Sequence, residues 1–178
     1  MVFKRSLLAL FLVCVDKAVY AQSNFSLYAY GKGIEPGLQL FYGDGQAYLG
    51  SSAPSFVSQA VNVSSGEDAE FVATPNRTVD GWSAEPTLFI DLTEGANNPI
   101  GFVKKNESLG SGSTVSGFGL YGGWAFHKDD GGPIAMKFLA SPTNETGIYL
   151  VKWNAGATRA DDDVPISLRT LAPVPITA

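Results

Sequence analysis

The stretch LQLFYGDGQAYL, residues 38–49, places two short apolar and aromatic runs on either side of Gly43-Asp44-Gly45. Glycine and aspartate tolerate the positive φ angles that a tight hairpin turn requires. We therefore expect two antiparallel strands here, over residues 38–42 and 46–49. This hairpin is the clearest local indication of a β fold in the chain.

The same pattern continues on both sides of the hairpin. No stretch of eleven or more residues has apolar positions at helical spacing, and short β-branched or aromatic runs recur between clusters of Gly, Pro, Asn and Asp. Their spacing predicts an all-β fold, a single-domain antiparallel β-sandwich or β-barrel. The expected strands cover residues 25–30, 38–42, 46–49, 56–63, 70–74, 87–92, 100–103, 114–121, 124–127, 134–139, 147–153 and 166–171.

The first 21 residues are typical of a secretory signal peptide. Lys4 and Arg5 precede an apolar run over residues 7–15, and Ala21 ends a small-residue cleavage site. We expect residues 1–21 to be removed, which leaves residues 22–178 as one secreted domain. The run is too short for a transmembrane helix, and we expect no membrane anchor.

Cleavage after Ala21 also changes composition and charge. The only cysteine, Cys14, is lost, so disulfides, thiol chemistry and cysteine-bound zinc are not expected. The chain has 12 basic and 17 acidic side chains. The leader contains three of the basic and one of the acidic side chains, so its removal changes the formal charge from −5 to −7. An acidic domain disfavours nucleic acid and anionic lipid as partners.

Five Asn-x-Ser/Thr sequons predict N-glycosylation in a secreted chain. An acceptor asparagine must be accessible, so we expect these positions in loops or at strand ends. The five asparagines are Asn24, Asn62, Asn76, Asn106 and Asn144.

His127, the only histidine, is a weak candidate for a catalytic base because Asp129 and Asp130 follow it closely. No Gly-x-Ser-x-Gly nucleophile motif accompanies it. The alternative is a strand-end histidine beside a polar hairpin, and this is the interpretation we prefer. Whether the chain is an enzyme stays open, and the sequence favours a protein without catalytic activity.

Gly117, Gly119 and Gly122 formally match the dinucleotide motif Gly-x-Gly-x-x-Gly. That motif works only where a strand precedes it and a helix follows it. Here Trp124-Ala125-Phe126 predicts another strand, so we expect a glycine-rich bend where two backbones approach, and no nucleotide or other cofactor.

Carboxylate groups give no strong site. The acidic runs 161–163 and 129–130 lack the alternating ligand pattern of a calcium loop, so we interpret them as solvated turns and expect no metal site. A glycosidase pair among Glu85, Asp91 and Glu107 is conceivable, but sequence spacing cannot give their separation in space.

Aromatic residues are the remaining candidates for binding. We select Trp82, Trp124 and Tyr121, which would form a sugar-stacking platform on an open sheet or line a cavity for an apolar metabolite. Core positions are the alternative, and we expect them for Trp153 and Phe126.

Several segments in order support a family resemblance: residues 25–30, the run 45–50 with its Gly-x-x-Tyr-Leu-Gly pattern, residues 100–103 and Gly117-Phe118-Gly119. Together they resemble small secreted proteins of filamentous ascomycetes, distantly the phialide-type fungal cell-wall proteins. The resemblance implies an extracellular or cell-wall location and transfers no catalytic residue. The family members usually carry cysteines, which this chain lacks after cleavage.

Three functions follow as alternatives. The first is a non-catalytic, glycosylated cell-wall or surface protein that binds polysaccharide or a host component. The second is a β-barrel pocket protein or enzyme for an apolar small molecule, acting by cyclisation or coupling. The third is a secreted effector that acts on a host protein.

Overall fold

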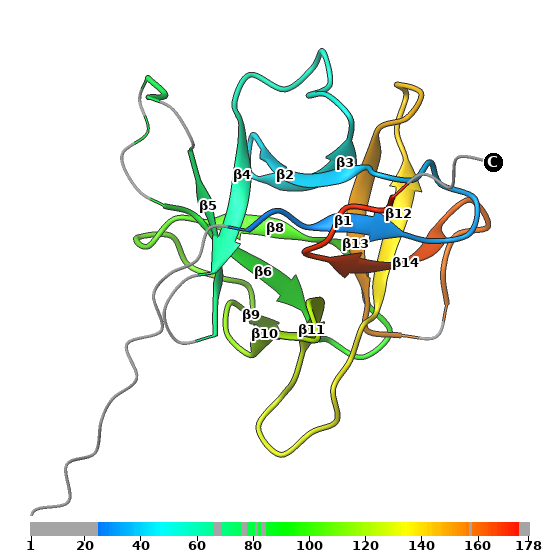
Figure 1. Ribbon diagram of the computed structural model, residues 1–178. Coiled ribbons are helices and arrows are strands. Elements are labelled where there is room, and N and C mark those ends of the chain that lie inside the picture. The colour runs from blue at the N-terminus through cyan, green and yellow to red at the C-terminus, as the bar shows by residue number, and fades with distance from the viewer. Residues whose placement is uncertain are drawn as a thin grey trace, which may run out of the picture.

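The structure, a computed structural model, describes residues 25–65, 69–75, 78–80, 82, 85–156 and 158–174. The predicted leader, Cys14, Asn24 and Asn76 lie outside these residues. The described part is all-β, as predicted, and its strands pair antiparallel (Figure 1). The strands are β1 (Tyr28–Tyr30), β2 (Gln39–Gly43), β3 (Gln46–Gly50), β4 (Ala60–Ser65), β5 (Phe71–Thr74), β6 (Thr87–Asp91), β7 (Asn97–Pro99), β8 (Gly101–Val103), β9 (Ser113–Thr114), β10 (Phe118–Tyr121), β11 (Trp124–His127), β12 (Phe138–Pro142), β13 (Tyr149–Asn154) and β14 (Val164–Arg169).

The predicted hairpin is confirmed and becomes β2 and β3. Asp44 and Gly45 form its two-residue turn with φ angles of 46° and 95°. Both angles are positive, which suits the right-handed twist of the flanking strands. The two strands pair along their whole length, from Gly43 opposite Gln46 to Gln39 opposite Gly50.

The β2–β3 hairpin is shared by two closed rings of strands. The outer edge of β2 pairs with β1 at Gln39 and with β4 from Phe41 onwards. The outer edge of β3 pairs with β8 at Gln46 and with β13 near Leu49. One ring runs through β1, β2, β3, β13, β12 and β14, and the other through β2, β4, β5, β6, β8 and β3. Closure favours the barrel over the sandwich, because it leaves few unpaired edges.

Alternating side chains fill the interior of the rings. Leu40 and Leu49 face each other across the shared hairpin, and both are fully buried. Trp153 of β13 is 2% exposed and lies edge-on to Phe138 of β12 at 5.1 Å between ring centroids. The expected core position of Trp153 is therefore confirmed, and one continuous apolar cluster links the strands of both rings.

A second, smaller cluster lies on the outer side of the shared hairpin. Phe41, Tyr48 and Ile148 form it. Residues 51–59, here called the flap, connect β3 to β4 on this side of the hairpin, and flap residue Val57 packs on the cluster. Two carboxylates hold the flap: Asp44 accepts hydrogen bonds from Ser58 and Gln59, and Glu145 accepts them from Ser55.

The sequence misplaces four elements. The single strand expected over residues 114–121 is two strands, since β9 ends at Thr114 and pairs with β6, whereas β10 begins at Phe118 and pairs with β11. The strand expected over residues 56–63 begins only at Ala60, because the preceding residues belong to the flap. The strand expected over residues 134–139 begins at Phe138, although Ala135 forms an isolated bridge with His127. Strand β7 is missed, since Asn97-Asn98-Pro99 has a turn-like composition. The described residues include no helix of the length and apolarity needed to span a membrane.

Candidate functional site

A row of aromatic and basic side chains crosses four adjacent strands. Tyr121 of β10 is directly opposite Trp124 of β11, which is opposite Arg169 of β14, which is opposite Tyr28 of β1. Directly opposed residues project from the same face of a sheet. We call these four residues, together with Tyr30, the outer row.

The outer row faces away from the core. Trp124, Arg169 and the two tyrosines of β1 are each next to a buried residue, namely Ala125, Leu168 or Ala29, which are 0–1% exposed. Because successive side chains in a strand point to opposite faces, the row occupies the outer surface. Tyr121 is the most open member, with 70% of its side chain exposed.

Side-chain contacts fix the centre of the row. The guanidinium carbon of Arg169 lies 4.9 Å from the centroid of the Trp124 ring, a cation–π geometry. The Tyr30 ring meets Trp124 edge-on at 5.3 Å, and the Tyr30 hydroxyl donates a 2.7 Å hydrogen bond to the Leu171 carbonyl. These contacts hold the rings in place before any ligand binds.

Arg169 brings positive charge to an acidic protein. Among the described residues the ion pairs are Lys152 with Asp163 and His127 with Asp129, and neither includes Arg169. A guanidinium offers five N–H donors in a planar fork. The row therefore combines stacking surfaces with hydrogen-bond donors.

The outer row contains two of the predicted binding residues, Trp124 and Tyr121, but not Trp82. Trp82 packs against the core beside Tyr42, with ring centroids 5.4 Å apart. Its Nε1 is buried and finds no hydrogen-bond partner among the described residues. Phe126 was expected in the core, but it is half-buried on the outer side of the sheet. Its ring lies over the backbone of Gly119.

Two backbones approach closely at Gly117, as predicted, but Gly119 lies within strand β10 and is not part of a bend. Gly117 has a φ of 88°, and a Cβ there would lie 2.6 Å from the Lys128 carbonyl oxygen. Gly119 leaves room for the Phe126 ring, because a Cβ would come within 2.6 Å of it. Gly122 and Gly123, with φ of 57° and 83°, turn the chain from β10 to β11 and so place Tyr121 opposite Trp124.

His127 lies inside the protein and not in the outer row. It is 3% exposed, and its ring is edge-on to Phe118 and Trp153 at 5.3 and 5.7 Å. Burial lowers the pKa of His127 from its ordinary value, while the charge of Asp129 and a hydrogen bond with the Ser116 backbone oppose this effect. The Asp129 carboxylate is 3.8 Å from Nε2.

The acidic run 161–163 is not a solvated turn throughout, so that interpretation is wrong for Asp163. Its side chain is fully buried and lies 3.1 Å from the Lys152 ammonium, and Asn97 also donates to it. Burial alone would raise the pKa of Asp163, but hydrogen bonds from Ser141, Asn97 and Lys152 outweigh it and lower the pKa. No cluster of three potential metal ligands occurs among the described His, Cys, Asp and Glu residues.

Two of the three carboxylates considered for a glycosidase pair accept local hydrogen bonds. Asp91 accepts hydrogen bonds from Thr93 and Asn98, and the Thr93 bonds lower its pKa. Glu107 accepts a bond from the Lys104 amide within its own turn, and Glu85 is exposed.

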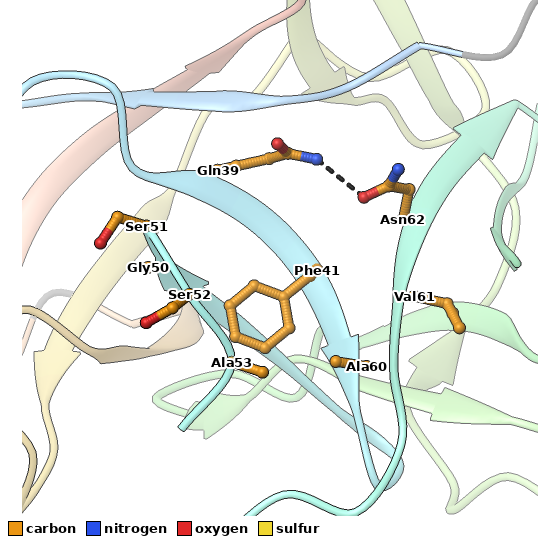
Figure 2. A pocket seen from close by; sticks show the side chains of 9 residues that line it. All are labelled: Gln39, Phe41, Gly50, Ser51, Ser52, Ala53, Ala60, Val61 and Asn62. Atoms are coloured by element: carbon orange, nitrogen blue, oxygen red, sulfur yellow. Dashed lines mark hydrogen bonds between the residues drawn. The ribbon is translucent and has the colours of Figure 1, made fainter. Parts of the chain in front are cut away.

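A polar pocket lies beside the flap (Figure 2). Its volume is about 340 Å³, and it lies between residues 50–53 and the start of β4, with Phe41 between them. Gln39 donates a 2.8 Å hydrogen bond to Oδ1 of Asn62 and a 3.2 Å bond to Ser26. The nine lining residues are Gln39, Phe41, Gly50, Ser51, Ser52, Ala53, Ala60, Val61 and Asn62.

An apolar pocket lies beside Tyr30 of the outer row. Its volume is about 670 Å³, and the segment 31–36 and the C-terminal residues 173–174 enclose it. Ile34, Pro36 and Val174 give it an apolar lining, and Glu35 is the one charged residue among the described residues that line it.

The described sequons fall into two kinds. Asn106 and Asn144 are exposed in turns, as expected of glycan acceptors. Asn62 is different, because it is half-buried within β4 and pairs with Phe41 on one side and Thr74 on the other. The expectation that the sequons mark loops or strand ends is wrong for Asn62.

Comparison of the chain with protein-family models, curated proteins and solved structures finds no match. The candidate site therefore depends on geometry alone. Arg169, Tyr28 and Tyr30 belong to it and were not selected from the sequence. Nothing local marks them, because Arg169 meets Trp124 through the pairing of β14 with β11, and Tyr28 and Tyr30 come beside Trp124 through the pairing of β1 with β14.

Proposed function

We propose that this chain is an exported, N-glycosylated protein without catalytic activity that binds cell-wall or other extracellular polysaccharide through the outer row. The observation that carries the proposal is the register of Tyr121, Trp124, Arg169 and Tyr28 on one face of four strands. Neighbouring strands are about 4.8 Å apart, so the row extends over roughly 15 Å. A row of this length suits a polymer better than a single small molecule.

The chemistry of the row matches that of a sugar chain. Aromatic rings stack on the apolar faces of sugar rings, while hydroxyl and guanidinium groups bond to the sugar oxygens. Arg169 and Tyr30 hold Trp124 in place, so little side-chain ordering is needed on binding. The resemblance to secreted wall proteins supports the same partner.

Retention on insoluble chitin, β-glucan and mannan tests the proposal. We expect the protein to be retained on at least one polymer and Tyr121→Ala to bind about tenfold more weakly, which corresponds to about 1.4 kcal/mol. Tyr121 is 70% exposed, so its loss should leave stability nearly unchanged.

Phe56→Ala is the matched control, because it removes an exposed ring from the flap, outside the row. It should be retained like the unmodified protein. If no polymer retains the protein, or if Tyr121→Ala is retained equally well, polysaccharide binding by the row is wrong.

The apolar pocket supports a second candidate, a carrier of an apolar small molecule. Its volume of about 670 Å³ is within the usual range for small-molecule sites, and its lining is mainly apolar. A fluorescent apolar probe should bind with saturation, and Ile34→Asp should abolish that binding. Unsaturable binding, or binding unchanged by Ile34→Asp, would remove this candidate.

A further inference from the structure

Strand β10 is the free end of the sheet. Its one strand partner among the described strands is β11, whereas every strand of the two rings has a partner on each side. The amide N–H of Phe118 points away from β11, because it donates a 2.8 Å hydrogen bond to the Ala69 carbonyl. Residues two apart in a strand direct their main-chain groups the same way, so the N–H and C=O of Leu120 also point outward. No described residue bonds to them from that side.

The residues around this edge lack the usual protection against strand pairing. Proteins commonly protect an exposed edge with charged side chains, especially lysine, or with proline. Residues 115–126 contain neither a charged residue nor a proline. Leu120 and Tyr121 are 39% and 70% exposed and project from opposite faces of the sheet. The free edge of β10 is therefore a template on which another strand can pair.

A second copy of this chain is the partner that fits the edge. Two identical strands that pair antiparallel about a two-fold axis present the same residues to each other, so the free donor and acceptor at Leu120 are used equally in both copies. The chain has a formal charge of −5, which makes two copies repel each other. Pairing through the uncharged run 115–126 avoids placing like charges opposite each other.

The contact at Phe118 limits the register of such a pair. The Ala69 carbonyl already occupies the edge there, so a second strand can pair only along residues 120–122, and the two-fold axis passes beside Tyr121. Tyr121 is the end of the outer row on β10. Because directly opposed residues project from the same face, the two Tyr121 side chains meet on the outer face and the two outer rows join end to end. The joined row crosses four strands of each copy and extends over about 34 Å.

We propose that two copies of this chain associate edge to edge through β10, antiparallel about a two-fold axis at Tyr121. Stable interfaces bury about 1,200 Å² or more in total, and an overlap limited to residues 120–122 is smaller, so the dimer is weak and forms at high local concentration. A polymer that binds two copies raises that concentration. The association does not depend on the proposed function, and only its role in lengthening the polysaccharide site does.

Disulfide trapping tests the pairing without any sugar. In a Cys14→Ser background, an introduced cysteine is the only one in the chain. Directly opposed residues of an antiparallel pair have Cβ atoms about 4.5–5.5 Å apart, which a small adjustment brings to disulfide geometry. With oxidised glutathione as the oxidant, we expect Tyr121→Cys to form linked dimers about tenfold faster than Val174→Cys, because pairing raises the local concentration of the two thiols. Val174 is 81% exposed, so random collisions alone would link it at least as fast.

Leu120→Lys is the variant that should disrupt the pair. A lysine on an edge strand opposes pairing, and the partial exposure of Leu120 allows the longer side chain without unfolding. Added to Tyr121→Cys, it should reduce linking to the rate of Val174→Cys. In sedimentation equilibrium, the average mass of the unmodified protein should rise with concentration, whereas Leu120→Lys should keep the monomer mass.

Two results would overturn the proposal. One is a monomer mass for the unmodified protein at every concentration, and the other is linking of Tyr121→Cys no faster than that of Val174→Cys. Failed retention on polysaccharide would leave the dimer in place and remove only its role in lengthening the outer row, so the two proposals fail separately.

Discussion

His127 illustrates how burial of a single side chain makes stability depend on pH. Its folded-state pKa is lowered chiefly by burial, whereas in the unfolded chain the ring has its ordinary pKa of about 6.5. Below that pH the unfolded chain binds more protons than the folded chain, so the free energy of unfolding falls as pH falls. No other histidine contributes, since the chain has one.

Denaturant unfolding across this range measures the effect. The free energy of unfolding should be constant above about pH 6.5 and decrease on acidification towards pH 5. His127→Gln should be less stable overall but show a flat profile there. Three carboxylates also have lowered pKa values: Asp44, Asp91 and Asp163. Their contributions to the free energy of unfolding are lost only below their ordinary pKa of 3.8, so they do not affect this range. A slope retained in the variant would show that His127 is not its source.

The Lys152–Asp163 pair predicts a second residue-scale effect. Lys152→Met leaves the fully buried Asp163 carboxylate without its cation, which should cost about 3 kcal/mol of unfolding free energy. The double variant Lys152→Met with Asp163→Asn removes both charges and should recover much of the loss. Thermal unfolding of the three proteins measures this. Equal stability of Lys152→Met and the unmodified protein would contradict the role of the pair.

Local sequence predicts residues whose role is set by the backbone and fails for those set by distant neighbours. Asp44 and Gly45 are identifiable because a hairpin turn needs positive φ from two adjacent residues. Asp163 is not, because it precedes β14 and its partners lie in two distant strands, Lys152 in β13 and Asn97 in β7. Trp82 was selected for its loop-like neighbours, yet tertiary packing places its ring against Tyr42.

At the scale of elements, the flap depends on carboxylates from two separate turns. Asp44 in the β2–β3 turn accepts three hydrogen bonds from Ser58 and Gln59, each 2.8 Å long. Burial would raise the pKa of Asp44, but these bonds outweigh it and lower the pKa. The flap should therefore stay anchored at neutral pH and loosen only as pH falls well below 3.8.

Asp44→Asn tests the anchoring at neutral pH. Asparagine keeps the positive φ but presents one acceptor oxygen where aspartate presents two. We expect amide hydrogen exchange at Ser58 and Gln59 to become about five- to tenfold faster, from a loss of roughly 1 kcal/mol in hydrogen bonding. Exchange in β12 should not change. Unaltered protection at Ser58 would mean that Glu145 and packing on Tyr48 hold the flap without Asp44.

Elements were easier to predict than their ends. Strand β6 was found within one residue because Thr87, Phe89 and Ile90 make it a short run rich in β-branched and aromatic residues. Strand β7 was missed because Asn97-Asn98-Pro99 has no strand propensity of its own and pairs through its backbone with β13. The flap was merged with β4, since Phe56 and Val57 continue the apolar pattern although they pack on the outer cluster.

The whole molecule depends on one hairpin that belongs to both rings. Leu40 is fully buried and pairs with Leu49 at the centre of that hairpin. Leu40→Ala should therefore cost about 2–5 kcal/mol and weaken both rings together. Unfolding followed by tryptophan fluorescence and by far-ultraviolet circular dichroism should give one shared midpoint, lower than in the unmodified protein.

Val174→Ala is the control for Leu40→Ala, because Val174 is 81% exposed and its truncation should leave the midpoint unchanged. Two separate midpoints in Leu40→Ala would mean that the rings unfold independently. Ring closure itself could not be predicted from the sequence, because it depends on the pairing of β1 with β14 across nearly the whole described chain. The same long-range pairing assembles the outer row.

The most direct test of polysaccharide binding by the outer row is a two-dimensional NMR titration with a soluble oligosaccharide from the polymer that retains the protein. The three tryptophan side chains give three indole N–H signals. We expect the Trp124 indole and the amides of Tyr121 and Arg169 to shift with saturation, while the indoles of Trp82 and Trp153 do not. Shifts confined to other residues, or no shift at saturating sugar, would contradict binding by the outer row.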